Sequence, residues 1–495
     1  MPVFQALNKE DFPMEWKQLL SGEKLAQDSA LPDQFSRFPI NTFELDYSNL
    51  VSSAAFRRLQ DKTQVYPLDK GDFVRTRLTH SIEVSTVARQ LGMMITDDKS
   101  EYARAELREY RAEIPSVLAC VALLHDLGNP PFGHFGEALI GEWFRSALDS
   151  LTYKGKPVRE WLTPQMARDL ENFEGNAQAL RLLAKAQRGG SINLSMAVMG
   201  ALLKYPTDSL HFDRKDPDIR RHKLGYFASE EKAFHTVTRT LGMYDADGAV
   251  CRHPLTYLME AADDIAYATA DLEDALNKGL FNLDQFITRY RDAYRDQFQD
   301  DCIPHGIPAD YSERLLTELE TMRAQAGPNG DEAAIFHAWL LQVRNWLMYA
   351  AVYRFSKNYE DIMAGRYQED LFYETNHVLT LQILKNITAE YAYDSAGILR
   401  LELAAESIVT FLLEKYVHAV LCCDKQYQDS ANKPTSSDRK YLATMPREHL
   451  LDYQRARTGD EATDLYLRIL MATDFLSGMT DGYARTLYRE ARGID

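Results

Sequence analysis

Residues 117–129 read Val-Leu-Ala-Cys-Val-Ala-Leu-Leu-His-Asp-Leu-Gly-Asn, and this stretch decides the fold. Its eight apolar residues lead directly into the dipeptide His125-Asp126. An uninterrupted apolar run is typical of a buried element, so the imidazole and the carboxylate at its end are expected to be buried as well. Burial of both groups costs free energy unless a partner or a metal ion satisfies them. The stretch therefore predicts a polar site at the end of a buried element.

The sequence on either side of this stretch has the periodicity of helices. Apolar residues in 80–95 and in 258–276 recur at intervals that mix three and four, which predicts amphipathic helices. Strand signals are scarce, and Thr63 to Tyr66 is one short candidate. No internal period indicates a solenoid. The pattern predicts an all-α fold.

Polar or Pro/Gly-bearing breaks separate the helical segments. They fall near 150–157, 206–225, 304–308, 325–331 and 425–439, and the last of these is expected to be an exposed loop. None has the length of an interdomain linker. We therefore expect an N-terminal extension at 1–44, a helical core at 45–280 and a helical C-terminal region at 281–495.

Composition and charge exclude some classes of function. The chain has 495 residues, of which 45% are hydrophobic, and this is enough for a large core. Its 73 acidic and 56 basic residues give a formal charge of -17. Such a charge argues against broad, non-specific adhesion to nucleic acid or to an anionic membrane. It remains compatible with a local basic pocket for a phosphorylated ligand.

Cysteine usage and the N-terminus indicate a cytoplasmic protein with no membrane partner. An odd number of cysteines without metal-finger spacing is a poor disulfide framework and favours a reducing compartment. The five are Cys120, Cys251, Cys302, Cys422 and Cys423. The first ten residues lack the pattern of a signal peptide. No apolar stretch approaches the roughly 20 residues that a membrane-spanning helix needs.

Three separated fragments supply four candidate metal ligands: His80, His125-Asp126 and Asp263. Donors on different helices can converge in the interior of a bundle. Two nitrogen and two oxygen donors suit Mn²⁺, Fe²⁺, Co²⁺ or Mg²⁺, and Zn²⁺ is also compatible. Alternatively, each residue is a satisfied core residue or a helix cap, which is the better reading of any one fragment alone. The three fragments together favour a metal site.

The wider sequence resembles one family. The order His80, His125-Asp126, Asp263 is similar to the H…HD…D signature of the HD-domain metal-dependent phosphohydrolases. Six longer strings resemble the deoxynucleoside triphosphate triphosphohydrolases, the dGTPase family. They are FRRLQDKTQV (56–65), RTRLTHS (75–81), HDLGNPPFGHFGE (125–137), FEGNAQ (173–178), EAADDIAY (260–267) and MTDGYA (479–484). The resemblance implies an HD-domain helical bundle with an additional helical C-terminal region that completes the pocket and makes subunit contacts.

The resemblance also implies a reaction. Water attacks the α-phosphorus of a deoxynucleoside triphosphate, with dGTP as the first candidate, and releases the deoxynucleoside and inorganic tripolyphosphate. The cofactor is a divalent metal ion, Mn²⁺ or Mg²⁺ first and then Co²⁺, Fe²⁺ or Zn²⁺. His80, His125, Asp126 and Asp263 are its expected ligands.

A basic set is expected around the triphosphate. Arg77 lies three residues before His80 on the same helical face or the turn entering it, where a guanidinium can hold a phosphate in a bidentate manner. Asn129 is expected to orient the turn or to hold a phosphate oxygen. The resemblance assigns the other polyphosphate contacts to Lys204, Tyr205 and Lys223.

His134, Glu137 and Asp126 are the expected catalytic residues. The intervening Asn-Pro-Pro-Phe-Gly, residues 129–133, cannot continue a helix, so the chain turns and a new helix starts. That turn can bring His134 back over the metal site, with Glu137 fixing its tautomer. A histidine in this position can donate a proton to a departing oxygen near neutral pH.

The sugar is expected to meet a third group of residues. Tyr267 lies four residues after Asp263, and Asp271 lies eight after it, so all three share one helix face. A Tyr267 ring against C2′ would disfavour a 2′-hydroxyl. Asp271 and Gln64 are the candidates for the 3′-hydroxyl or neighbouring sugar atoms.

One departure and two alternatives accompany the resemblance. Family members often carry an Asp-Arg-Asp-Arg-like run where this chain reads Asp46-Tyr47-Ser48-Asn49. One alternative is another HD phosphohydrolase, either a nucleoside monophosphatase or a phosphodiesterase. The other is a non-catalytic nucleotide sensor or nucleic-acid-binding protein. The family implies a homo-oligomer, and hexamers are among its known forms. Binding of single-stranded nucleic acid in a groove at a subunit interface is a further alternative that the sequence leaves undecided.

Overall fold

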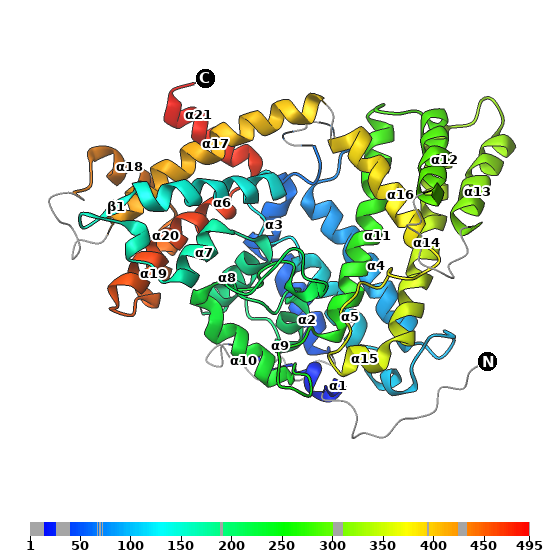
Figure 1. Ribbon diagram of the computed structural model, residues 1–495, viewed down its shortest axis with the longest axis horizontal. Helices are drawn as coiled ribbons and strands as arrows, with labels where there is room; N and C mark the ends of the chain where they lie inside the picture. Colours follow the sequence, from blue (N-terminus) through cyan, green and yellow to red (C-terminus); the bar gives the residue numbers. More distant parts are fainter. Residues whose placement is uncertain are drawn as a thin grey trace.

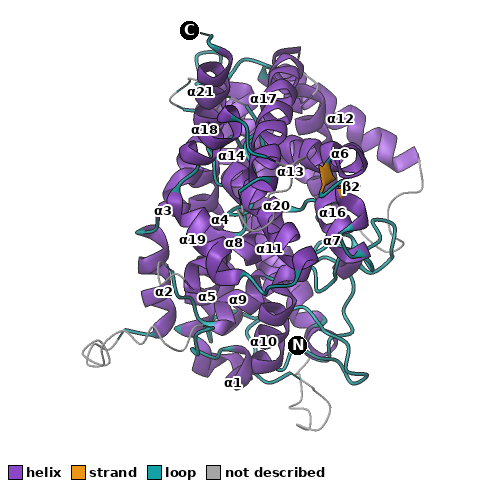
Figure 2. Cartoon of the chain, turned by 90° about the vertical axis from the view of Figure 1, so that its left-hand side faces the viewer, coloured by secondary structure: helices purple, strands orange, loops and turns teal. Residues whose placement is uncertain are grey.

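The computed structural model describes residues 14–25, 40–66, 68, 71, 73–188, 192–299, 310–393, 396–423 and 433–494 (Figure 1). Within these ranges helices joined by loops make up the chain, and the strands are one short antiparallel pair, β1 (Thr152–Tyr153) and β2 (Lys156–Pro157) (Figure 2). The all-α expectation is therefore confirmed. None of the described helices combines the length and the apolar character that crossing a membrane requires.

Three helices pack against one another at the centre: α4 (Arg77–Thr96), α5 (Glu113–Leu124) and α11 (Pro254–Asn277). The apolar run of residues 117–124 forms the last two-thirds of α5, and all eight of its side chains are buried. Helix α4 begins at a capping box, in which Thr76 and Thr79 satisfy each other's backbone N–H groups. The helices expected over 80–95 and 258–276 are thus confirmed, each with extra residues at both ends.

Further helices surround this centre. The N-terminal half supplies α1 (Trp16–Leu19), α2 (Thr42–Val51), α3 (Ala54–Arg57), α6 (Gly133–Ser150), α7 (Pro164–Glu171), α8 (Gly175–Arg188), α9 (Met196–Leu202) and α10 (Glu231–Leu241). Short 3₁₀ turns are η3 (Arg58–Asp61), η4 (Ala105–Tyr110), η5 (Val158–Glu160), η6 (Ile219–Arg221) and η7 (Ala228–Glu230).

The C-terminal half divides into two groups on opposite sides of the centre (Figure 1). One group comprises α12 (Leu283–Gln299), α13 (Asp310–Ala326), α14 (Glu332–Lys357), α15 (Tyr359–Met363), α16 (Val378–Thr388) and the π-turn η8 (Ala389–Tyr393). The other comprises α17 (Ala396–Leu421), α18 (Ser436–Thr444), α19 (Arg447–Ala456), α20 (Glu461–Ser477) and α21 (Asp481–Arg492).

Two hydrophobic clusters follow this division. The larger contains α4, α5 and α11 together with α12, α14 and α16. The second joins α6 and α7 to α17, α20 and α21, so segments more than 200 residues apart share one core. The chain passes from the first cluster to the second at residues 125–133, immediately after α5. His125, Asp126 and Asn129 lie at this passage, and His134 follows it directly.

Two expectations about loops and strands are wrong. Residues 63–66 form no strand, because only Thr63 makes a bridge, to Thr76, and the neighbouring residues turn. The break at 425–439 is partly helical, since α18 begins at Ser436. Its residues 425–432 and the whole of 304–308 lie outside the described ranges.

Candidate active site

His125 caps the C-terminal end of α5, and its tautomer is fixed by its neighbour. Its Nδ1 lies 2.6 Å from the carbonyl oxygen of Ala122, and a carbonyl only accepts, so Nδ1 must carry the proton. In the neutral ring Nε2 then presents a lone pair. This atom is buried and has no hydrogen-bond partner among the described residues. It is the kind of nitrogen that a metal ion binds.

His80 and Asp263 meet His125 from the other two central helices. His80 Nε2 lies 3.1 Å from Asp263 Oδ1, and His125 Nε2 lies 3.4 Å from the same oxygen. One donor atom from each of the three residues falls within 4.8 Å of the others. Two nitrogens and an oxygen on three packed helices, with one lone pair unused, fit a divalent metal ion.

The electrostatics keep both aspartates of this region ionised. Burial opposes the charge of Asp263, but His125, Lys204 and His80 hold its pKa well below the usual range. Burial likewise opposes the charge of Asp126, but Arg77 and the two imidazoles hold its pKa below the usual value. Ionised carboxylates are the form that binds a metal.

Asp126 lies beside the three-donor group. Its Oδ2 is 3.4 Å from His125 Nε2 and forms an ion pair of 2.7 Å with Arg77 Nη1. Its Oδ1 accepts a hydrogen bond of 2.6 Å from the Asn129 side chain. The structure thus brings together the four ligands expected from the sequence, three as a compact group and Asp126 tied to Arg77 at its edge.

The turn after Asp126 requires a special backbone. Phe132 and Gly133 both have positive φ, 65° and 60°, and a side chain at residue 133 would collide with the Arg77 guanidinium. Glycine at this position therefore lets α6 start beside the buried Arg77. The expected new helix before His134 is confirmed, because α6 begins at Gly133.

His134 and Glu137 form a directed pair on the first turn of α6. His134 Nδ1 lies 2.8 Å from Glu137 Oε2, and Glu137 Oε1 accepts a hydrogen bond of 2.8 Å from Gly175 N. Burial opposes the charge of Glu137, yet its bond to His134 holds the pKa of the carboxyl below its usual value. The His134 side chain is 75% exposed, whereas that of Glu137 is 8% exposed. A fixed carboxylate thus orients an accessible imidazole.

A cavity of about 330 Å³ opens between this pair and the ligand group. Its lining includes His125, Asp126, Asn129, His134, Lys204, Tyr205, His222, Lys223, Arg252, Glu260 and Asp263. A second hollow of about 470 Å³ shares His134, Tyr205, His222 and Lys223 with it. Lys204 Nζ lies 3.5 Å from Asp263 Oδ2, so cationic groups approach the ligand group directly.

The residues expected to meet the sugar lie apart from this cavity. Gln64, Tyr267 and Asp271 are absent from its lining, and so is Arg77, which was expected to hold a phosphate. The Tyr393 hydroxyl lies 2.6 Å from that of Tyr267 and donates to Asp271 Oδ2 at 2.8 Å, which links η8 to α11. Burial raises the pKa of Asp271 to about 7. Its Oδ1 and the Gln64 side-chain oxygen are both buried without a partner among the described residues.

Lys62 and Asp481 had no role predicted from the sequence, yet their hydrogen bonds hold the segments around the site together. Lys62 is buried, and its Nζ donates to the carbonyl oxygens of Asn129 and Ser477, each at 2.6 Å. Asp481 accepts from the backbone N–H groups of Thr63, at 3.0 Å, and Phe132, at 2.9 Å. Both lie within strings that resemble the family, but no local pattern reveals contacts between residues 418 positions apart.

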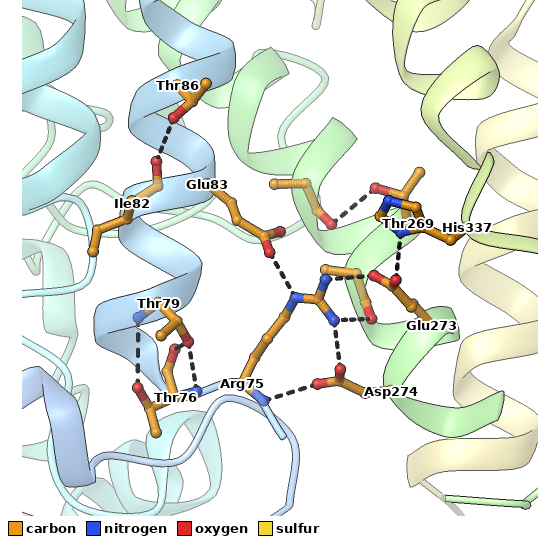
Figure 3. A network of polar contacts seen from close by, with 12 residues as sticks. Arg75, Thr76, Thr79, Ile82, Glu83, Thr86, Thr269, Glu273, Asp274 and His337 are labelled. Carbon is orange, nitrogen blue, oxygen red and sulfur yellow. Dashed lines mark hydrogen bonds and ion pairs between the residues drawn. The ribbon is translucent and has the colours of Figure 1, made fainter. Parts of the chain in front are cut away.

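Arg75 fastens the start of α4 to α11 (Figure 3). Its guanidinium pairs with Glu83 on α4 and with Glu273 and Asp274 on α11. Its backbone N–H also donates to Asp274. This network fixes the relative position of the two helices that carry His80 and Asp263.

Comparisons with known proteins agree with this geometry. The family profile described as HD domain matches residues 77–174. The chain is 39% identical over 490 residues to a deoxyguanosinetriphosphate triphosphohydrolase-like protein of Listeria monocytogenes, covering 97% of this chain and 100% of the relative. It is 33% identical over 493 residues to a protein of the same description from Synechocystis, with 97% and 100% covered. The deoxyguanosinetriphosphate triphosphohydrolase of Klebsiella pneumoniae is 31% identical over 492 residues, with 92% and 94% covered. Because the HD-domain profile matches residues 77–174 and relatives of this description match the chain along almost its whole length, the chain belongs to the deoxyguanosinetriphosphate triphosphohydrolase family.

Proposed function

We propose that this protein hydrolyses deoxynucleoside triphosphates, dGTP first among them, to the deoxynucleoside and inorganic tripolyphosphate. The observation that supports it most is the position of His80, His125 and Asp263 beside a cavity that also contains Lys204, Lys223 and His134. A monophosphate needs fewer cationic contacts than a triphosphate, so this basic lining favours the longer substrate. The names of the relatives agree with this substrate class.

His80, His125, Asp126 and Asp263 would hold the metal, with Mn²⁺ or Mg²⁺ as the first candidates. When bound, such an ion supplies Lewis acidity toward a phosphoryl oxygen. Lys204 and Lys223 neutralise the charge that develops on the phosphates. Tyr205 and Asn129 place the phosphate oxygens, and Arg77 acts on a phosphate or through its ion pair with Asp126.

The bond between the α-phosphorus and O5′ breaks as the oxygen of water bonds to phosphorus, and the water gives up one proton to solvent. His134 gives the proton that O5′ needs in order to leave. Glu137 accepts a hydrogen bond from Nδ1 of His134. In the charged ring, the proton on Nε2 therefore faces outward and is the one that is transferred. Glu137 is anchored by Gly175 and therefore keeps the imidazole oriented throughout the step.

We also propose that Tyr267, Asp271 and Gln64 meet the sugar. The side-chain oxygens of Asp271 and Gln64 that have no partner among the described residues are suited to a ligand hydroxyl group. The ring of Tyr267 is stacked on that of Tyr393, with centroids 6.3 Å apart. This pair would form one wall of the sugar site.

We further propose that residues 281–495 complete the site and make the contacts of a homo-oligomer, a hexamer first. Tyr393 and Asp481 come from this region and bind residues of the first 280. Leu399 and Leu403 on α17 are 50% and 66% exposed. Apolar side chains exposed to that extent are suited to a subunit interface.

Two variants test the assigned roles. Asp126→Ala is expected to abolish turnover, whereas His134→Gln is expected to lower kcat by about 10² to 10⁴ and to retain the bound metal. The measurements are dGTP turnover and metal content after gel filtration. His211→Gln is the matched control, because His211 is also exposed and also pairs with a carboxylate three residues away. Loss of metal in His134→Gln, or an equal loss of turnover in His211→Gln, would contradict the role of His134.

A further inference from the structure

A second group of potential metal ligands lies far along the chain from the candidate active site. His418, Cys422 and Asp438 each offer a donor atom, and the three atoms fall within 4.8 Å of one another. His418 lies in the last turn of α17, Cys422 immediately follows that helix, and Asp438 lies in the first turn of α18. None of the three lines the cavity beside His125.

The geometry of this group is built by two independent features. His418 and Cys422 are four residues apart, so they share one face at the end of α17. Helix α18 is held against α17 by a hydrogen bond of 2.7 Å between the hydroxyls of Tyr416 and Thr444. The donors of the two elements therefore meet through contacts that do not involve the group itself.

The carboxylate of Asp438 is oriented for a ligand. Its Oδ2 accepts from the backbone N–H and the hydroxyl of Thr435, both at 2.7 Å, in the capping box of α18. Its Oδ1 is directed to His418 Nδ1 at 2.9 Å. Metal-binding carboxylates are commonly fixed in this manner by their second oxygen.

Burial and access also suit a metal ion. Cys422 and Asp438 are each only 5% exposed, whereas the His418 side chain is 53% exposed and borders the solvent. A buried thiol and carboxylate next to an accessible imidazole provide both a dry site and an entry path. If His418 and Asp438 served only to hydrogen-bond each other, no cysteine would be needed beside them. The position of Cys422 therefore favours a metal site.

We propose that His418, Cys422 and Asp438 bind a divalent metal of the Zn²⁺ type through one nitrogen, one sulfur and one oxygen. Zn²⁺ favours this donor set in tetrahedral geometry, in which neighbouring ligand atoms lie about 3.3–3.8 Å apart. The observed spacing reaches this geometry by small side-chain movements. Binding replaces the proton shared by His418 and Asp438 and releases the thiol proton of Cys422 to solvent. The metal then links the end of α17 to the start of α18.

The test is Co²⁺ binding to chelator-treated, full-length protein, followed by absorption spectroscopy. Thiolate bound to Co²⁺ gives an intense near-ultraviolet charge-transfer band, and the candidate active site has only nitrogen and oxygen donors. The band is expected in the wild type, absent in Cys422→Ser and retained in Cys423→Ser, whose cysteine is adjacent in sequence. Zinc content is expected to fall by one equivalent per chain in Cys422→Ser.

His418→Gln supplies a second variant that does not alter a buried side chain. It is expected to weaken Co²⁺ binding at this site at least tenfold while dGTP turnover stays unchanged. Circular dichroism of the metal-free variants checks that they are folded. Absence of the band in the wild type, or its persistence in Cys422→Ser, would overturn the proposal without affecting the proposed hydrolase function.

Discussion

At the scale of single residues, the His-Asp pair is defined by what surrounds it. Ala122 fixes the tautomer of His125, and Arg77 and Asn129 occupy the two oxygens of Asp126. The sequence predicted His80 and Asp263 as companions, and the structure places both against His125. Three helices bring their polar side chains to one point, and this is what makes the His-Asp pair part of a candidate metal-binding group.

Lys62 leads to a prediction about pH. Burial, helped by the nearby Arg77, lowers the pKa of its ammonium group to about 7, whereas an unfolded lysine titrates near 10.5. Between these values the unfolded chain binds a proton that the folded chain lacks, so the free energy of unfolding rises with pH. Relative to Lys62→Met, the wild type is expected to gain up to about 1.4 kcal/mol per pH unit from pH 7 to 9.

The measurement is urea unfolding of both proteins at pH 7, 8 and 9. Because the two proteins share all other titrating groups, their difference isolates Lys62. A difference in the free energy of unfolding that stays constant across this range would show that Lys62 keeps its ordinary pKa in the folded protein.

Tyr267 leads to a prediction about sugar selectivity. If its ring stands against C2′, Tyr267→Ala removes the obstacle to a 2′-hydroxyl. The ratio of kcat/KM for GTP to that for dGTP is expected to rise by roughly tenfold or more. Tyr393→Phe, which keeps the ring and removes the hydroxyl bonded to Asp271, is expected to change the ratio less. An unchanged ratio in Tyr267→Ala would remove this residue from the sugar site.

At the scale of elements, helix α21 holds the turn at residues 129–133 in place. Asp481, its first residue, is 1% exposed and accepts from the backbone of both Thr63 and Phe132. Asp481→Ala leaves these buried donors unsatisfied and is expected to lower the free energy of unfolding by about 2–4 kcal/mol. It is also expected to lower kcat, since Phe132 immediately precedes the helix that carries His134.

Asp460→Ala is the matched control, because Asp460 is also an aspartate at the start of a C-terminal helix, α20, but it faces solvent. It is expected to leave kcat unchanged. Urea unfolding and steady-state kinetics measure both variants. Equal kinetic effects of the two substitutions would contradict a specific role for Asp481 in positioning this turn.

The sequence predicted elements well where local chemistry determines them. The periodicity of residues 80–95, the apolar run 117–124 and the break at residues 129–133 predicted α4, α5 and the start of α6. The prediction failed at residues 63–66. Their sequence is typical of a strand, but contacts of Thr63 with Asp481 and Thr76 hold them in a turn. It also missed the start of α18, where polar residues form a capping box rather than a loop. Contacts over hundreds of positions leave no trace in a local pattern.

At the scale of the whole molecule, the site lies where two hydrophobic clusters meet. His80 and Asp263 lie on helices of the larger cluster and His125 caps another of them, whereas His134 lies in the first turn of a helix of the second. Their relative positions therefore depend on the packing of both. The C-terminal helices α20 and α21 contribute to this packing from the far end of the chain, as Figure 1 shows.

This arrangement predicts stabilisation by metal. Mn²⁺ at about 100 times its dissociation constant is expected to raise the free energy of unfolding by about 2.7 kcal/mol, because a metal that binds only the folded chain shifts the equilibrium by mass action. Thermal unfolding with and without Mn²⁺ measures the effect. His80→Ala is expected to remove it, whereas His418→Gln is expected to retain it. A shift of the same size in His80→Ala would place the Mn²⁺ site elsewhere.

The most direct test of the proposed function is the identity of the products formed from dGTP in H₂¹⁸O. Attack of water on the α-phosphorus predicts deoxyguanosine without label and tripolyphosphate with one ¹⁸O, resolved by anion exchange and mass spectrometry. Formation of dGMP with pyrophosphate, release of single phosphates, or label in the 5′-hydroxyl of deoxyguanosine would contradict it.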